Sequence, residues 1–192
     1  MGGAVRKSAA ATREKLLASA RQRFLRESYE NVGLRDIAAD VGVDVALVGR
    51  YFGSKEQLFT EVLRGGKADW LEPLAKADDL AEGLTALASE KHRSDSNEHL
   101  EGLLILLRSV SSPTAAPLVR AAFRDDVLEP LAKLLTGTDR DLRAGIAMGV
   151  IMGTTIVRSI MNVEALQCCD AGLFESKLAH ILRCAIETPE KK

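Results

Sequence analysis

The stretch that decides the fold is Gly33–Gln57, which reads GLRDIAADVGVDVALVGRYFGSKEQ. Ile37 and Val41 lie four residues apart and therefore share one face of a short helix. Gly42 follows, and glycine tolerates the left-handed backbone conformation that a sharp turn between two helices requires. Asp44 then stands where the N-cap of the next helix is expected. A short helix, a glycine turn and a second short helix form the pattern of a helix-turn-helix.

The second helix of this pattern is expected over about residues 45–52. Val48 faces inward and, with Val43 before the N-cap, forms a hydrophobic staple. The outward face carries one long cation among short side chains, so it is suited to close approach to a groove of duplex DNA. The outward residues are Asp44, Val45, Ala46, Gly49 and Arg50.

The helix after the motif is expected to begin at Ser54. Ser54 and Gln57 are three residues apart, which is the spacing of a capping box. The N–H groups and partial positive charge at such a helix start favour phosphate, and Lys55 adds a full charge there. Tyr51 is amphipathic, so its ring fits the core and its hydroxyl fits the phosphates, although a role in the core alone also fits.

Three of these side chains have two interpretations. Arg50 fits either the edge of a guanine or a phosphate. Asp44 fits a cytosine amine, but its use as an N-cap accounts for it without DNA. Arg35, near the start of its helix, fits a phosphate or a base edge.

Charge is distributed unevenly along the 192 residues. The net charge is −1 and the isoelectric point about 6.3, yet residues 1–55 carry ten Lys and Arg against six Asp and Glu. Residues 1–55, the head, are therefore basic, and the remaining residues, the body, are acidic. A basic head indicates that its partner is anionic. The low net charge argues against a protein that coats DNA without specificity. Residues 1–11 read as a loose basic tail, whose Arg6 and Lys7 fit an arm in the minor groove or plain disorder.

The whole chain reads as all-α, with about nine helices. Apolar residues recur at helical spacing almost everywhere, and no run alternates as a strand does. Six of the eight aromatic residues precede residue 71, as expected of a small head that needs large side chains to fill its core. We expect an N-terminal three-helix domain over residues 1–55 that carries the helix-turn-helix. A C-terminal helical bundle is expected over residues 56–192.

The motif resembles a known family. Residues 34–38 (LRDIA), 42–43 (GV), 51–56 (YFGSKE) and 58–59 (LF) look like the DNA-binding domain of TetR-family, tetracycline-repressor-like, transcriptional regulators. The resemblance extends over about residues 10–64. It implies a ligand-responsive dimeric regulator, a repressor, that binds a palindromic operator in the cytoplasm and is not an enzyme. The body is then a ligand-binding and dimerisation domain for a small-molecule effector.

This sequence departs from the family pattern at three positions. Gly33 stands where the family usually has a Thr or Ser cap that touches phosphate, and Gly49 where a Tyr often contacts the backbone. Asp44 replaces a common Ser. Phosphate contacts are then either fewer or supplied by Arg35, Arg50 and the basic tail.

The body offers candidates for a ligand site and a dimer interface. Soft or aromatic side chains on its helices suit a cavity wall, although each also suits simple core packing. These candidates are Trp70, Phe123, Met148 and Met152. Arg108 and Arg158 follow apolar runs and fit an acidic ligand, a protein carboxylate or a snorkelling role.

A stripe of glycines at four-residue spacing indicates a close helix crossing, either within the bundle or against a second subunit. These glycines are Gly145, Gly149 and Gly153.

Other classes of protein find less support. No motif for hydrolysis, phosphate cradling or dinucleotide binding occurs, so we expect neither catalytic residues nor a cofactor. The three cysteines lack metal-site spacing and read as free buried thiols in a reducing cytoplasm. The longest apolar stretch, residues 144–157, is too short for a membrane span and reads as a buried helix. The rival is a helical binding protein or enzyme that shares only the shape of the head.

Overall fold

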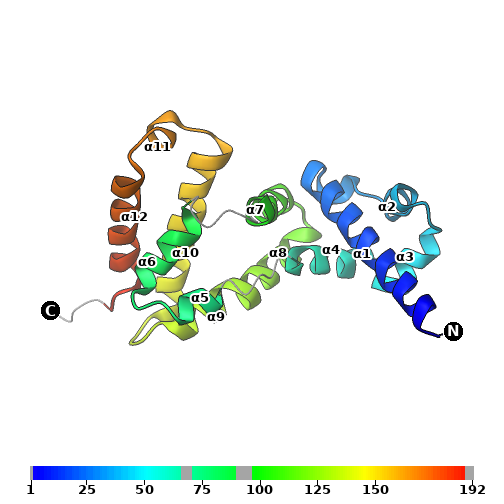
Figure 1. The fold of residues 1–192 in the computed structure, drawn as a ribbon, viewed down its shortest axis with the longest axis horizontal. Helices are drawn as coiled ribbons and strands as arrows, with labels where there is room; N and C mark the ends of the chain where they lie inside the picture. The colour runs from blue at the N-terminus through cyan, green and yellow to red at the C-terminus, as the bar shows by residue number, and fades with distance from the viewer. Residues whose placement is uncertain (1, 66–70, 90–96, 189–192) are drawn as a thin grey trace. The chain divides into compact units, whose positions relative to one another are not determined.

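The structure is a computed structural model that describes the backbone of residues 2–65, 71–89 and 97–188 (Figure 1), with side chains from residue 9 and, after the second gap, from residue 100. The described residues contain helices and no strand, which confirms the all-α fold. The chain forms two compact units. Unit 1 comprises Met1–Gly66 and Glu101–Ala122, and unit 2 comprises Lys67–Leu100 and Phe123–Lys192.

Unit 1 is built from a long first helix and several short ones. Its elements are α1 (Gly2–Arg26), η1 (Tyr29–Asn31), α2 (Leu34–Val41), α3 (Val45–Phe52), α4 (Lys55–Arg64), most of α7 (Asn97–Ser109) and α8 (Ala115–Phe123). The expectation of a loose tail over residues 1–11 is wrong, because α1 begins at Gly2. The alanines of this segment are strong helix formers, and no proline interrupts them.

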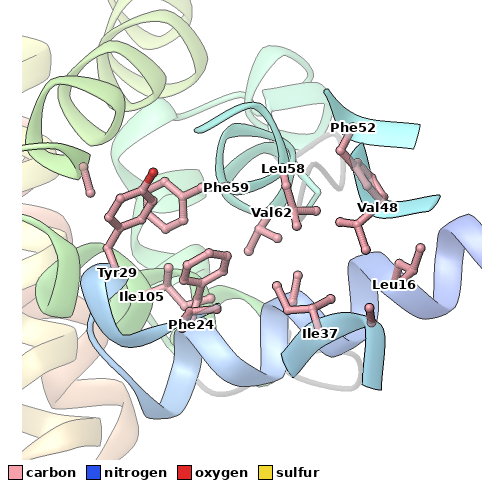
Figure 2. Close-up of a cluster of buried hydrophobic side chains, with 14 of the residues drawn as sticks. Leu16, Phe24, Tyr29, Ile37, Val48, Phe52, Leu58, Phe59, Val62 and Ile105 are labelled. Atoms are coloured by element: carbon pink, nitrogen blue, oxygen red, sulfur yellow. The ribbon is translucent and has the colours of Figure 1, made fainter. Parts of the chain in front are cut away.

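An aromatic cluster fills the core of unit 1 (Figure 2). Phe24 and Phe59 are fully buried, with ring centroids 4.8 Å apart in an edge-on arrangement. Tyr29 packs on both, at 5.0 Å from Phe59 and 5.9 Å from Phe24. The aromatic bias of the N-terminal sequence therefore serves the purpose expected of it, the filling of a small core.

Helices α7 and α8 complete this core from far along the chain. Ile105 and Val119 are buried in the same cluster as Phe24. The Arg21 guanidinium also donates to the Glu101 carboxylate over 2.9 Å. The first compact unit therefore extends beyond the boundary after residue 55 that the sequence suggested, because α4 and residues 101–122 bury their apolar faces in it.

Unit 2 is a helical bundle. Its elements are α5 (Leu71–Ala75), α6 (Leu80–Ala88), the π-helix η3 (Arg124–Leu128), α9 (Glu129–Leu134), α10 (Arg140–Thr155), the π-helix η4 (Ile156–Ile160), α11 (Glu164–Gln167) and α12 (Ala171–Ile186). Helices α6, α10 and α12 pack against one another (Figure 1). Leu84, Leu131 and Leu182 are fully buried at the centre.

Two sequence-based expectations about unit 2 need correction. The stretch 144–157 is buried on one face only, because Ala144 and Ala147 lie in the core whereas Ile146 is 47% exposed. The cysteines are free but not buried: Cys168 and Cys184 are exposed and Cys169 is half-buried. None of the helices in the described ranges combines the length and the hydropathy that a membrane-spanning helix requires.

Candidate nucleic-acid interface

The turn between α2 and α3 has the geometry that its sequence predicts. Gly42 is left-handed, with φ of 72°. Its N–H donates to the Ala39 carbonyl over 3.1 Å, and the Val43 N–H donates to the Ala38 carbonyl over 3.0 Å. These two bonds close α2 as a Schellman motif and turn the chain sharply into α3.

Asp44 caps α3, as expected. Its carboxylate accepts a hydrogen bond from the Ala46 N–H over 2.7 Å. The side of α3 that holds Val48 and Phe52 is buried in the core of unit 1. This anchoring fixes which face of α3 points away from the protein.

The outward face of α3 carries the residues predicted for DNA contact. Asp44, Val45, Ala46 and Arg50 are exposed, and Gly49 is half-buried. A Cβ atom built on Gly49 meets no other atom within 4 Å. Arg35 on α2 is exposed as well, and neither Arg35 nor Arg50 forms an ion pair within the described residues. The helix-turn-helix thus offers two uncommitted guanidinium groups.

The start of α4 is a complete capping box. The Gln57 N–H donates to the Ser54 hydroxyl over 3.2 Å, and the Ser54 N–H donates to the Gln57 side chain over 3.0 Å. Lys55 is less available than its position suggested. Its ammonium lies 4.3 Å from the centre of the Tyr29 ring and 3.4 Å from the Glu30 carbonyl, and burial lowers its pKa. A phosphate contact by Lys55 stays a prediction.

Tyr51 and Gly33 complete the predicted surface. Tyr51 is half-buried, and its ring lies edge-on to Phe52 with centroids 6.4 Å apart. Gly33 occupies the N-cap position of α2 without a side-chain cap, and a Cβ atom there would lie 2.5 Å from the Asp36 carboxylate. The Asp36 carboxylate therefore fills the space that a capping side chain at residue 33 would need.

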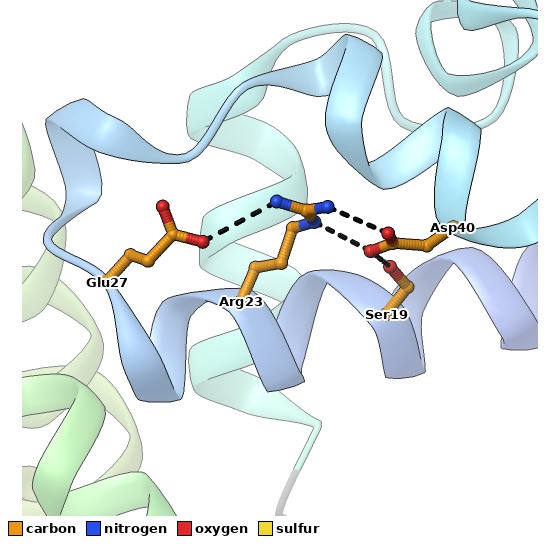
Figure 3. A network of polar contacts seen from close by, with 4 residues as sticks. All are labelled: Ser19, Arg23, Glu27 and Asp40. Carbon is orange, nitrogen blue, oxygen red and sulfur yellow. Dashed lines mark hydrogen bonds and ion pairs between the residues drawn. The ribbon is translucent and has the colours of Figure 1, made fainter.

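A polar clamp that sequence reasoning missed ties α1 to α2 (Figure 3). The Arg23 guanidinium donates two hydrogen bonds to the Asp40 carboxylate, at 2.6 and 2.7 Å, and also pairs with Glu27. The Ser19 hydroxyl donates to Asp40 over 2.8 Å. The hydrogen bonds from Arg23 and Ser19 lower the pKa of Asp40 to about 2. The four-residue spacing of Ser19, Arg23 and Glu27 was visible in the sequence, but their partner on α2 was not.

The clamp makes a pH-dependent contribution that can be measured. The unfolded-state pKa of an aspartate is about 3.9, so the depressed pKa of Asp40 stabilises the fold above about pH 4, and this contribution disappears as the pH falls towards 2. We expect Asp40→Asn to lower the melting temperature at pH 7. Near pH 2, the melting temperatures of the variant and the wild type should become similar. Thermal unfolding from pH 7 to 2 tests this, with Glu14→Gln on exposed α1 surface as the control. A difference between Asp40→Asn and wild type that stays constant with pH would contradict it.

In unit 2, the three stripe glycines open onto free space. A Cβ atom built on Gly145, Gly149 or Gly153 meets no other atom within 4 Å among the described residues. The same helix exposes Leu142 and Ile146, and the neighbouring α12 exposes Leu173 and Ile181. These four apolar residues, with the three glycines, are called the α10–α12 face below. The stripe is therefore not used in a crossing within the described part of this chain.

The predicted ligand residues do not come together around a described cavity. Met148 packs at the edge of the unit 2 core, and Phe123 and Met152 are half-buried. Trp70 lies outside the described residues. A groove in unit 2 runs between α6 and α12 and is lined by other side chains, among them Thr85, Ser89 and Ser176. The ligand residues stay predictions.

The fold and the exposed face of α3 define a helix-turn-helix DNA-binding protein. Comparison with known families agrees. The family "Bacterial regulatory proteins, tetR family" matches residues 16–62, and "Tetracyclin repressor-like, C-terminal domain" matches residues 78–185, more than half of the chain. The chain belongs to the TetR family of transcriptional regulators.

The individual relatives share only a limited part of their sequence with this chain. The HTH-type transcriptional regulator BetI of Agrobacterium fabrum is 39% identical over 69 residues, so the match spans only 34% of each protein. A TetR-family regulator from Streptomyces coelicolor A3 is 25% identical over 91% of this chain and 94% of its own, with a TM-score of 0.56. NalD, the secondary repressor of the MexAB-OprM multidrug efflux pump in Pseudomonas aeruginosa, has the same fold. It is 19% identical over 93% of this chain and 95% of its own, with a TM-score of 0.63.

Proposed function

We propose that this TetR-family regulator is a homodimeric repressor. In this proposal it binds a palindromic operator through α3 and releases it when a small molecule binds unit 2. The observation that carries the proposal is the outward face of α3, where Arg50 is exposed and has no partner among the described residues, next to the small residues Ala46 and Gly49. Short side chains allow the helix to enter a major groove, where a guanidinium recognises the O6 and N7 atoms of guanine. The repressor role is supported by the family and by the description of NalD.

The α10–α12 face supports the dimer. Leu142 is 64% exposed and Leu173 54% exposed, although both are large apolar side chains. The glycine stripe lies on α10 along with Leu142, and its open space lets a second helix approach the backbone closely. A second copy of the chain fits this face because one two-fold axis pairs identical surfaces. A two-fold dimer carries two copies of α3 and therefore reads a palindrome.

Ligand response then works as a shift between two populations. A ligand that binds one conformation of unit 2 more tightly than the other favours that conformation, and a few kcal/mol of differential affinity suffices. Phe123, Met148 and Met152 are the proposed apolar wall of the ligand site. The protein acts where the chromosome is, so we place it in the cytoplasm.

Arg50→Ala tests the proposed function directly. We expect the substitution to weaken binding to a palindromic duplex, selected by the wild type from a random library, by about 1–3 kcal/mol, and to relax the preference at one base pair in each half-site. Fluorescence anisotropy with the selected duplex and its single-base variants measures both effects.

The matched control is Arg120→Ala, which removes an exposed arginine of unit 1 far along the chain from the motif. It should leave both affinity and preference unchanged. Equal binding by wild type and Arg50→Ala to every duplex would remove Arg50 from the interface. A wild type that selects no duplex at low salt would refute the regulator itself, because electrostatic attraction to DNA is strongest there.

A further inference from the structure

Unit 2 buries two arginines that differ in their partners. Arg143 on α10 is 5% exposed, and its guanidinium donates to three backbone carbonyls, those of Thr136, Thr138 and Ile186. This arginine joins the segment before α10 to the end of α12. Its hydrogen-bonding capacity is used within the fold, so its role is structural.

Arg158 is buried to nearly the same degree, at 9% exposed, but no acidic side chain among the described residues neutralises its charge. Its guanidinium forms no ion pair and no hydrogen bond to any residue that the structure describes, and its Nε atom is fully buried without a partner. The guanidinium carbon lies 4.2 Å from the centre of the Phe174 ring. That cation–π contact offsets only part of the cost of removing a charge from water.

The backbone around Arg158 is fixed rather than loose. The residue sits in the π-helix η4, where the Met161 N–H donates to the Ile156 carbonyl over 2.8 Å. The Gln167 side chain donates a hydrogen bond to the Arg158 carbonyl, which fastens η4 to the short helix α11. Single π-helical turns occur often at functional sites. The unpaired cation is therefore held in place by the fold, as a preorganised binding group would be.

From these observations we propose that Arg158 is the anion-binding group of an effector site in unit 2, and that the effector is a small organic carboxylate with an apolar body. The Phe174 ring covers one face of the guanidinium, so the edge with its N–H donors is left for a carboxylate, which guanidinium groups bind in a two-pronged arrangement. Phe174 belongs to the apolar core of unit 2, which suits an apolar ligand body. The inference rests on the proposed ligand response and gives its chemical class.

Paired probes test the charge requirement. Benzoate and octanoate are titrated against full-length protein, beside the neutral isosteres benzamide and octanamide, with the melting temperature as the readout. At least one carboxylate should stabilise the wild type more than its amide does. Arg158→Gln should weaken the binding of that carboxylate about tenfold or more. Arg140→Gln, which removes an exposed arginine at the start of the preceding helix α10, should leave it unchanged. Equal responses to acid and amide, or an undiminished response in Arg158→Gln, would overturn the proposal.

A ligand-free comparison tests the unpaired state independently. Arg158→Met replaces an uncompensated buried charge with an apolar side chain of similar length, so it should leave the melting temperature unchanged or raise it. Arg143→Met should lower it, because three carbonyls lose their donor. If Arg158→Met lowers the melting temperature as much as Arg143→Met, or converts the dimer to a monomer, then the fold or a second subunit supplies the counter-charge and the effector-site proposal is wrong.

Duplex binding separates this inference from the proposed function. A carboxylate that binds through Arg158 and lowers the affinity of the protein for the selected duplex supports both the effector site and the proposed ligand response. A carboxylate that binds through Arg158 without changing duplex affinity supports the site and contradicts the proposed ligand response. If the wild type selects no duplex, the regulator proposal fails, and the melting experiments still decide the role of Arg158.

Discussion

Phe24→Ala is expected to lower the free energy of unfolding of unit 1 by about 3–5 kcal/mol, the usual cost of removing a buried phenylalanine from a well-packed core. Phe24 is fully inaccessible and packs on both Tyr29 and Phe59. A domain is stable by only about 5–15 kcal/mol in total, so a large share of the stability is at stake. The cavity would lie next to Ile105, so α7 should lose stability along with α1.

Hydrogen exchange distinguishes this outcome from a local effect. Protection should fall in residues 101–122 as well as in α1–α4, and remain in α10 and α12 of unit 2. Leu25→Ala, at a half-buried neighbouring position, serves as the control and should lower the free energy of unfolding much less than Phe24→Ala does. Unchanged protection over residues 101–122 in Phe24→Ala would show that α7 and α8 do not unfold with the head.

Gly149→Leu is expected to abolish the proposed dimer and to lower affinity for the proposed operator by more than about 100-fold. Each DNA-binding unit would then bind a half-site alone, and the avidity of two linked units would be lost. Within one chain we expect the substitution to be tolerated, because a Cβ atom at residue 149 has open space beyond its own helix backbone and chain neighbours. Leucine also has a better helix propensity than glycine, by about 1 kcal/mol. The variant should therefore be a folded monomer.

Gly102→Leu is the matched control for this experiment. Gly102 is also helical, and a Cβ atom there also has free space around it, but it lies on α7 of unit 1. Sedimentation analysis should find Gly102→Leu dimeric and Gly149→Leu monomeric, with native circular dichroism for both. A dimeric Gly149→Leu with wild-type operator affinity would exclude the α10–α12 face as the interface.

Features that depend on residues close in sequence were predicted well. The left-handed Gly42, the Asp44 cap and the Ser54–Gln57 capping box each involve partners within four residues, and the structure has all of them. Such signals are local hydrogen bonds and steric limits, which the sequence shows directly. The same reasoning placed Val48 in the core and Arg50 on the surface, because a helix repeats every 3.6 residues.

Features that depend on distant partners were not predicted. Asp40 finds Arg23 across 17 residues, and Glu101 finds Arg21 across 80, so no spacing rule connects them. Lys55 has a suitable position for phosphate, yet its ammonium lies against Tyr29, which comes from another element. The sequence shows Arg158 only as one of two arginines that follow apolar runs. The packed structure shows that it is buried with no counter-ion among the described residues.

The contribution of residues 101–122 to the core of unit 1 has a consequence for recombination between relatives. A chimera that exchanges only the first 66 residues would combine a new Phe24 and Phe59 surface with the old Ile105 and Val119, and would carry mismatched packing. A recombination event that transfers the whole of unit 1 must therefore move two separate gene segments, those that encode residues 1–66 and 101–122. Exchange of the DNA-binding segment between relatives is therefore constrained in this chain by residues 101–122, which come from the middle of the sequence.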